Sequence, residues 1–266
     1  QRFRCLFQDG DRQAVLAALR AYQNADGGFG NALEPDLRGP DSQPVPAEMA
    51  LRVLAEAGGD ATTVARLGDW LVTVTTPEGG VPFVLPSVRR HPSAPWWQST
   101  DNPPASINPT GSIAGLLSKF GSRHHWLEGA IAYCWRALDA LQPEMHDVAA
   151  AIAFLEHVPD RERAERAFKV VGSRLLEEGL VTLNPADSGY VKKPLDWAPT
   201  PDSICRRLFT DEVIATHLDA LEAAQDPDGG WTITWPPVSA ACELEWRGAL
   251  TVDALRTLRA YDRLPG

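Results

Sequence analysis

The chain has 266 residues, 44% of them hydrophobic and 23% charged, so it is long enough to bury a sizeable core, and we expect a single globular domain over residues 1–266. Its formal net charge of −10 argues against a nucleic-acid partner, because binding to phosphates requires a basic face. Charged residues, proline or glycine interrupt every apolar run well before ~20 residues, which excludes an integral membrane segment.

The N-terminal segment and the cysteines bear on the cellular compartment in which the protein is found. Residues 1–7 have neither a long apolar core nor an initiating Met, so we interpret them as a trimmed end and not as a signal peptide. Cys5, Cys134, Cys205 and Cys242 are scattered and form no CxxC pair, which favours free thiols in a reducing environment. We therefore expect a cytoplasmic protein.

Apolar residues recur at helical spacing along most of the chain. The predicted helices are Gln13–Gln23, Ala47–Glu56, Thr62–Val74, Ser112–Phe120, Trp126–Leu141, Val148–Val158, Arg161–Leu176, Glu212–Ala224 and Trp246–Tyr261. A weaker helix is predicted at Ser203–Phe209, and Gln1–Phe7 is interpreted as a vestigial element. No run of alternating strand residues competes, so we predict an all-α protein.

The predicted helices alternate between two kinds. Helices that carry charges on one face end near Gln23, Val74, Leu141, Leu176 and Ala224. Helices rich in small and apolar residues begin near Ala47, Ser112, Val148 and Gly248, and helices of this kind are buried. This alternation is what an α/α toroid requires, so we predict about five outer/inner helix hairpins with long outer-to-inner loops.

The outer-to-inner links contain a second repeat. The first reads QNADGGF from Gln23, and the last reads QDPDGGW from Gln225. A degenerate copy follows at residues 75–81, and a looser one at residues 177–181. Glycine stops a helix and supplies a positive φ, Asp accepts backbone N–H bonds, and Gln is expected to bond a neighbouring helix terminus.

These turns resemble the QW motif of the prenyltransferase and squalene-cyclase (terpenoid cyclase) superfamily. The segment Leu19–Leu54 is similar to actinobacterial proteins that carry prenyltransferase/squalene oxidase repeats. The resemblance implies an α/α toroid with a central cavity, in which Gln23, Phe29, Gln225 and Trp231 are scaffold residues. It implies no particular reaction, because one fold hosts many functions.

The chain departs from that superfamily in its catalytic motifs. The acid motif D-x-D-D is absent, and its nearest match, at Asp9–Arg12, is interpreted as a helix cap. The metal-dependent motif D-D-x-x-D is absent as well. Cys242 has no later His that would complete a zinc site of the protein-prenyltransferase type. We therefore expect neither a metal nor a cofactor.

Candidate site residues lie in the long outer-to-inner loops. The catalytic candidates are Asp36, Glu34 and Asp41, and the substrate-binding candidates are Trp96, Trp97, Asp101, Trp197, Trp235, Glu243 and Glu245. All are expected around one mouth of the cavity. We favour Asp36 as the acid, because Pro35 stiffens its turn and flanking leucines supply the apolar surroundings that raise a carboxyl pKa.

Three functions remain open. The first is a terpenoid or isoprenoid cyclase-like enzyme that binds an apolar small molecule, with an acid to start cyclisation and Trp faces to stabilise the cation. The second is a non-catalytic binding or scaffold toroid, in which the same carboxylates only cap turns. The third is a carbohydrate-active lyase or hydrolase, in which paired carboxylates act beside Trp platforms.

Overall fold

The computed structural model describes residues 1–264, which fall into two compact units with bounds Gln1–Phe168 (unit 1) and Lys169–Gly266 (unit 2). The described residues contain eleven α-helices, two short 3₁₀ helices and no β-strand. Three isolated bridges are the only strand-like pairings among them. The protein is therefore all-α, as predicted.

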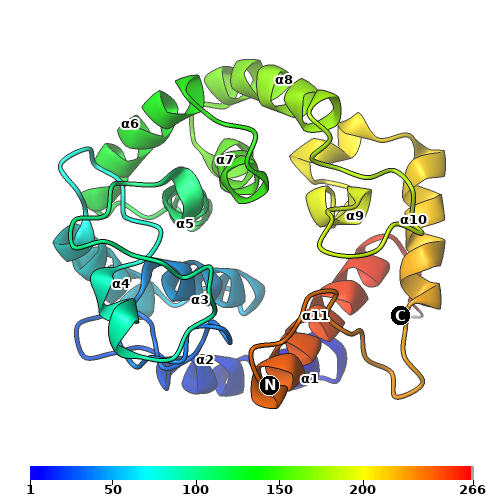
Figure 1. The fold of residues 1–266 in the computed structure, drawn as a ribbon, viewed down its shortest axis with the longest axis horizontal. Coiled ribbons are helices and arrows are strands. Elements are labelled where there is room, and N and C mark those ends of the chain that lie inside the picture. The colour runs from blue at the N-terminus through cyan, green and yellow to red at the C-terminus, as the bar shows by residue number, and fades with distance from the viewer. Residues whose placement is uncertain (265–266) are drawn as a thin grey trace. The chain divides into compact units, whose positions relative to one another are not determined.

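Unit 1 is built from two layers of helices. Its elements are α1 (Arg2–Phe7), α2 (Arg12–Arg20), α3 (Pro44–Glu56), α4 (Ala61–Val74), η1 (Pro86–Arg90), α5 (Ile107–Lys119), α6 (Trp126–Asp139), α7 (Met145–His157) and the first part of α8 (Arg161–Glu177). Within this unit, α2, α4 and α6 form one layer, and α3, α5 and α7 form the other (Figure 1). The two kinds of helix recognised in the sequence correspond to these two layers.

Small residues bring α5 and α7 into backbone contact. Gly111 and Gly115 of α5 are buried, and a Cβ atom added to them would lie 2.6 Å from the carbonyl oxygen of Ala150 and 2.3 Å from that of Ala153. Every residue of α5 from Pro109 to Leu117 is buried. The small-residue pattern therefore marks a helix enclosed by its neighbours α3, α6 and α7.

Unit 2 contains the rest of α8, followed by α9 (Pro194–Trp197), η2 (Ile204–Leu208), α10 (Asp211–Ala223) and α11 (Ala240–Ala260). Helix α10 contacts both α9 and α11. The helix predicted at Ser203–Phe209 is wrong, since this segment forms only the 3₁₀ turn η2. The hydroxyl of Tyr261 donates to the carbonyl oxygen of Ala198 at 2.9 Å and so joins the end of α11 to α9.

Side-chain caps extend two helices beyond their predicted starts. The carboxylate of Glu144 accepts hydrogen bonds from the backbone N–H groups of His146 and Asp147, so α7 begins at Met145 and not at Val148. Ser239 accepts from the backbone N–H of Cys242, so α11 begins at Ala240 and not at Trp246. The first turns of α7 (Met-His-Asp) and α11 (Ala-Ala-Cys) contain too few large apolar residues to extend the apolar periodicity, so both starts were placed too late.

Within residues 1–264, none of the helices has both the length and the apolar character that are needed to cross a membrane.

Candidate functional site

Three inter-helix turns share one backbone hydrogen-bond pattern. A residue at the start of each turn donates its N–H to the carbonyl of the second glycine, and the first glycine donates back to it. The first of these bonds is 2.9 Å long in each turn and joins Asn24 to Gly28, Thr76 to Gly80 and Asp226 to Gly230. Gly27, Gly79 and Gly229 have φ values of 95°, 93° and 88°, a left-handed conformation that favours glycine. The predicted repeat is therefore present in both units.

The looser copy after α8 has a different structure. The N–H of Leu180 bonds the carbonyl oxygen of Leu175 at 3.1 Å, and Gly179 has a φ of 70°. This geometry is that of a helix C-cap. The similarity of residues 177–181 to the other turns is limited to the glycine.

The side chains of the two glutamines of the repeat form hydrogen bonds to the backbone of their own turns. The side-chain amides of Gln23 and Gln225 donate to the carbonyls of Gly27 and Gly229, at 2.9 Å in both cases. Gln23 also donates to the carbonyl of Thr63 in the first turn of α4, at 3.3 Å, as expected of a bond to a neighbouring helix terminus. For Gln225 the predicted bond to a neighbouring helix terminus is wrong, since among the described residues its side chain bonds only its own turn.

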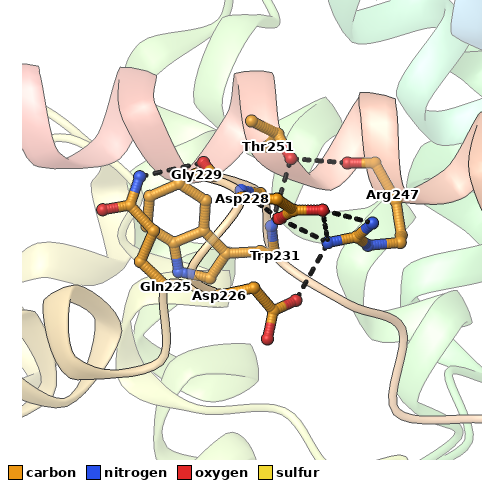
Figure 2. Close-up of polar contacts among 8 residues, drawn as sticks. Gln225, Asp226, Asp228, Gly229, Trp231, Arg247 and Thr251 are labelled. Atoms are coloured by element: carbon orange, nitrogen blue, oxygen red, sulfur yellow. Dashed lines mark hydrogen bonds and ion pairs between the residues drawn. The ribbon is translucent and has the colours of Figure 1, made fainter.

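The last turn is fastened to α11 by polar contacts (Figure 2). Arg247 of α11 pairs with Asp226 at 3.0 Å and with Asp228 at 2.9 Å. The backbone N–H of Trp231 donates to the hydroxyl of Thr251 at 3.2 Å, and the indole itself is buried. These residues hold the turn against α11, which fits the scaffold role that the resemblance implies.

The first two outer-to-inner loops of unit 1 pack against each other. We call residues 31–42 the acidic loop and residues 81–106 the second loop. Backbone hydrogen bonds join Arg38 N to Pro92 O at 3.1 Å and Ala94 N to Asp36 O at 3.0 Å. Beside them lies a buried apolar cluster of Leu37, Val84, Val88, Ala94 and Trp97. The second loop thus fixes the conformation of the acidic loop.

The acidic loop holds two buried carboxyl groups, because the side chains of Glu34 and Asp36 are each only 3% exposed. Burial, and next the nearby charge of Asp36, raise the pKa of Glu34 to about 8. The backbone N–H groups of Asp36 and Leu37 and the charge of Arg38 act in the opposite direction but are outweighed. Glu34 therefore carries a proton at neutral pH.

One oxygen of the Glu34 carboxyl, Oε2, is buried and has no hydrogen-bond partner within residues 1–264. A buried polar atom without a hydrogen-bond partner lowers the stability of the folded chain, and such atoms are rare in folded proteins. Glu34 and Asp36 are both catalytic candidates from the sequence, and Glu34 is the one whose pKa its surroundings raise to about 8.

Asp41 joins the acidic loop to the second loop. Its carboxylate pairs with Arg90 at 3.1 Å and with His91 at 3.1 Å. Beside this pair is a void of about 10 Å³, which leaves room for roughly one water molecule. Asp41 therefore joins the two loops through contacts with basic side chains, whereas the carboxyls of Glu34 and Asp36 are buried.

A buried amide supports the same junction. The Gln43 side chain donates to the hydroxyl of Ser87 and accepts from the backbone N–H of Leu85, both at 2.8 Å. Neither Gln43 nor Ser87 belongs to a motif that could have identified it from the sequence. The one local feature that marks position 43 in the sequence is its place directly before the proline that opens α3.

The three remaining candidates of unit 1 have different surroundings. Trp97 is buried in the apolar cluster and stacks on Phe83 with ring centroids 4.9 Å apart, and its Nε1 has no hydrogen-bond partner in the described part of the chain. Trp96 is 49% exposed. The side chain of Asp101 is largely exposed and pairs with Arg89 at 2.5 Å. Of these three, only Trp97 contributes to the packing around the acidic loop.

The candidates of unit 2 are also dispersed over several elements. Trp197 is buried at the end of α9. Trp235 packs edge-on against Tyr190 and Trp246, with centroids 5.5 Å apart in both pairs. Glu243 and Glu245, expected in a loop, lie in the first turns of α11. Their convergence with the unit 1 candidates around one mouth stays a prediction.

In the described residues, no three His, Cys, Asp or Glu side chains lie close enough together to hold a metal ion. Comparison with models of protein families finds no match, and neither do comparisons with curated proteins and with solved structures. The functional assignment therefore depends on the geometry of the chain itself.

Proposed function

We propose that the protein is a terpenoid-cyclase-like enzyme that binds an apolar or isoprenoid small molecule and donates a proton to it from Glu34. The observation that carries this proposal is the buried Glu34 carboxyl, which has a pKa of about 8 and an oxygen without a hydrogen-bond partner among residues 1–264. Asp36 keeps the proton on Glu34 through its nearby charge. It is therefore a positioning residue in this scheme.

The strength of the acid restricts the substrate. A carboxyl with a pKa of about 8 is a good general acid near neutral pH but a weak one for an unactivated alkene. An epoxide oxygen is a better proton acceptor, because its C–O bond breaks as the O–H bond forms. Attack of a substrate double bond on the resulting cation closes a ring, and loss of a proton from carbon completes an isomerisation that needs no co-reactant.

We also infer that the hairpins of both units close into one α/α toroid. The support is the alternation of two helix layers in unit 1 and the occurrence of the same turn in unit 1 and unit 2. A ring of this kind would place all outer-to-inner loops at one mouth. An experimental structure with a linear stack of hairpins would contradict the inference.

A pair of probes tests the proposed chemistry. A terminal-epoxide derivative of farnesol should be converted to an isomeric cyclic alcohol that mass spectrometry and NMR detect, whereas farnesol should bind unchanged. Glu34→Gln should abolish conversion while binding persists, and Asp36→Asn should reduce it strongly. Glu162→Gln, at an exposed glutamate of α8, is the matched control and should behave as wild type. Conversion by Glu34→Gln at the wild-type rate would refute the acid role.

A non-catalytic binding protein is the second candidate. It is favoured by the hydrogen bonds that the Glu34 carboxyl accepts within its own loop, because these alone would order the loop. In that case both probes should bind with similar affinity, neither should be converted, and Glu34→Gln should change stability alone. The same two probes therefore separate the two candidates.

A further inference from the structure

A second polar feature of unit 1 lies at the opposite end of its hairpins from the acidic loop. There the start of α2 meets the α3–α4 turn and the α5–α6 turn, and together they line an open groove of about 720 Å³. Ligand-binding pockets commonly have volumes of this order. None of the residues that line the groove belongs to the acidic loop or to the second loop.

The floor of this groove is apolar. Leu16 of α2 and Val64 of α4 line it and are themselves buried. Phe120 lies against the turn, since a Cβ atom added to Gly59 would be 3.6 Å from its ring. The floor therefore offers an apolar group a surface that includes one aromatic ring.

The rim of the groove is basic. Arg12 donates to the backbone carbonyls of Gly58 and Gly59, and Arg123 is exposed, so that in residues 1–264 neither guanidinium pairs with a carboxylate. Arg20 also lines the groove, with its Nη2 3.5 Å from the carboxylate of Asp60. Two guanidinium groups without a carboxylate stand out in a chain whose acidic residues exceed its basic ones by ten.

The acidic groups near the rim are already bonded. Asp60 accepts a hydrogen bond from the hydroxyl of Thr63 at 2.7 Å, and this bond is the main reason why its pKa is lowered, with Arg20 adding to the effect. Asp69 lies 3.2 Å from the ring of His124. Three arginines therefore face one carboxylate among the residues that line the groove.

We propose that this groove binds a phosphate monoester, with the phosphate between Arg12 and Arg123 and the organic group on the apolar floor. Guanidinium forks bind phosphate oxygens in pairs, and a dianion matches two arginines that lack a carboxylate partner better than a carboxylate does. The site is separate from the acidic loop and does not depend on the proton-transfer chemistry proposed there.

Three small probes test the assignment by NMR titration of the full chain at low salt and at about pH 7.5, where a phosphate monoester carries nearly two negative charges. Phenyl phosphate should bind saturably and shift the amide signals of the α3–α4 and α5–α6 turns. Inorganic phosphate, which lacks the apolar group, should bind more weakly at the same place. Benzoate, which has the ring but one negative charge, should bind most weakly.

Variants distinguish the contribution of the basic rim to binding from that of the apolar floor. Arg12→Ala and Arg123→Ala should each weaken phenyl phosphate about tenfold, the loss expected for one charge-assisted hydrogen-bonding partner. Phe120→Ala should weaken phenyl phosphate but not inorganic phosphate. Arg166→Ala removes the same charge from an exposed site on α8 and should leave binding unchanged.

Three results would overturn the assignment. They are the absence of saturable shifts in the groove, equal affinity for benzoate and phenyl phosphate, and unchanged binding in both Arg12→Ala and Arg123→Ala. A weakening by Arg166→Ala equal to that by the groove variants would show diffuse electrostatic attraction instead of a site, and would overturn it as well.

Discussion

Replacing Gly115 by alanine should destabilise unit 1, whereas the same replacement at Gly129 should stabilise it. Both glycines lie inside helices, Gly115 in α5 and Gly129 in α6. A Cβ atom at Gly115 would lie 2.3 Å from the carbonyl oxygen of Ala153, and one at Gly129 would meet nothing within 4 Å beyond its chain neighbours and the backbone of its own helix. The two substitutions therefore make the same chemical change in opposite surroundings.

The expected magnitudes follow from the geometry. Alanine is favoured over glycine within a helix by about 0.5–1 kcal/mol, and Gly129→Ala should gain this amount. At Gly115 the added carbon falls about 1 Å short of an ordinary C···O contact, so α5 and α7 must separate. Overpacking of this kind costs about 1–3 kcal/mol, and the loss should exceed the helix-propensity gain.

Urea unfolding followed by circular dichroism measures the difference. Both variants gain the same helix propensity, so we expect a gap in the free energy of unfolding equal to the overpacking cost, about 1–3 kcal/mol, with wild type between them. Gly111→Ala should behave like Gly115→Ala, because its Cβ atom would lie 2.6 Å from the carbonyl oxygen of Ala150. Stabilisation by Gly115→Ala equal to that by Gly129→Ala would refute the backbone contact between α5 and α7.

Three further predictions concern titration and the turns. The pKa of Glu34 in the folded chain, about 8, lies above its ordinary value of 4.5, so wild type should lose stability as the pH rises from 4.5 to about 8, by at most about 1.4 kcal/mol per pH unit. Urea unfolding of Glu34→Gln over this range should lack that loss. The pKa of His157 is lowered to about 4 by burial and then by the charge of Lys119, so stability should fall as the pH drops from 6.5 to 4, and His157→Gln should reduce the fall. Gln23→Ala should cost about 1–2 kcal/mol in thermal or urea unfolding and Gln225→Ala less, because Gln225 is exposed; equal costs would contradict the different roles of the two side chains.

The sequence predicted best those structural features that require one particular residue type. A glycine with a positive φ and a carbonyl-bonding Gln recur in two turns, and this pattern identified both from the sequence. Runs of small residues likewise identified the buried helices such as α5. Helix starts that depend on a single cap, such as Ser239, give no periodic signal and were placed too late.

The candidate site could be predicted only in part. Pro35 and the neighbouring leucines identified the loop that holds the buried carboxyls, but the burial of Glu34 and Asp36 depends on the second loop, which is distant in sequence. The basic groove could not be predicted, because Arg12 comes from the start of α2, Gly58 from the α3–α4 turn and Arg123 from the α5–α6 turn. Residues that come together only in the folded structure form no recognisable motif along the sequence.

Infrared difference spectroscopy tests directly whether the Glu34 carboxyl carries a proton at neutral pH. The carboxylic acid C=O band that is present in wild type and absent in Glu34→Gln should persist through neutral pH and disappear with a midpoint near pH 8. Loss of that band below about pH 5, near the ordinary pKa of a glutamate, would show that Glu34 is ionised at neutral pH and would contradict its role as the proton donor.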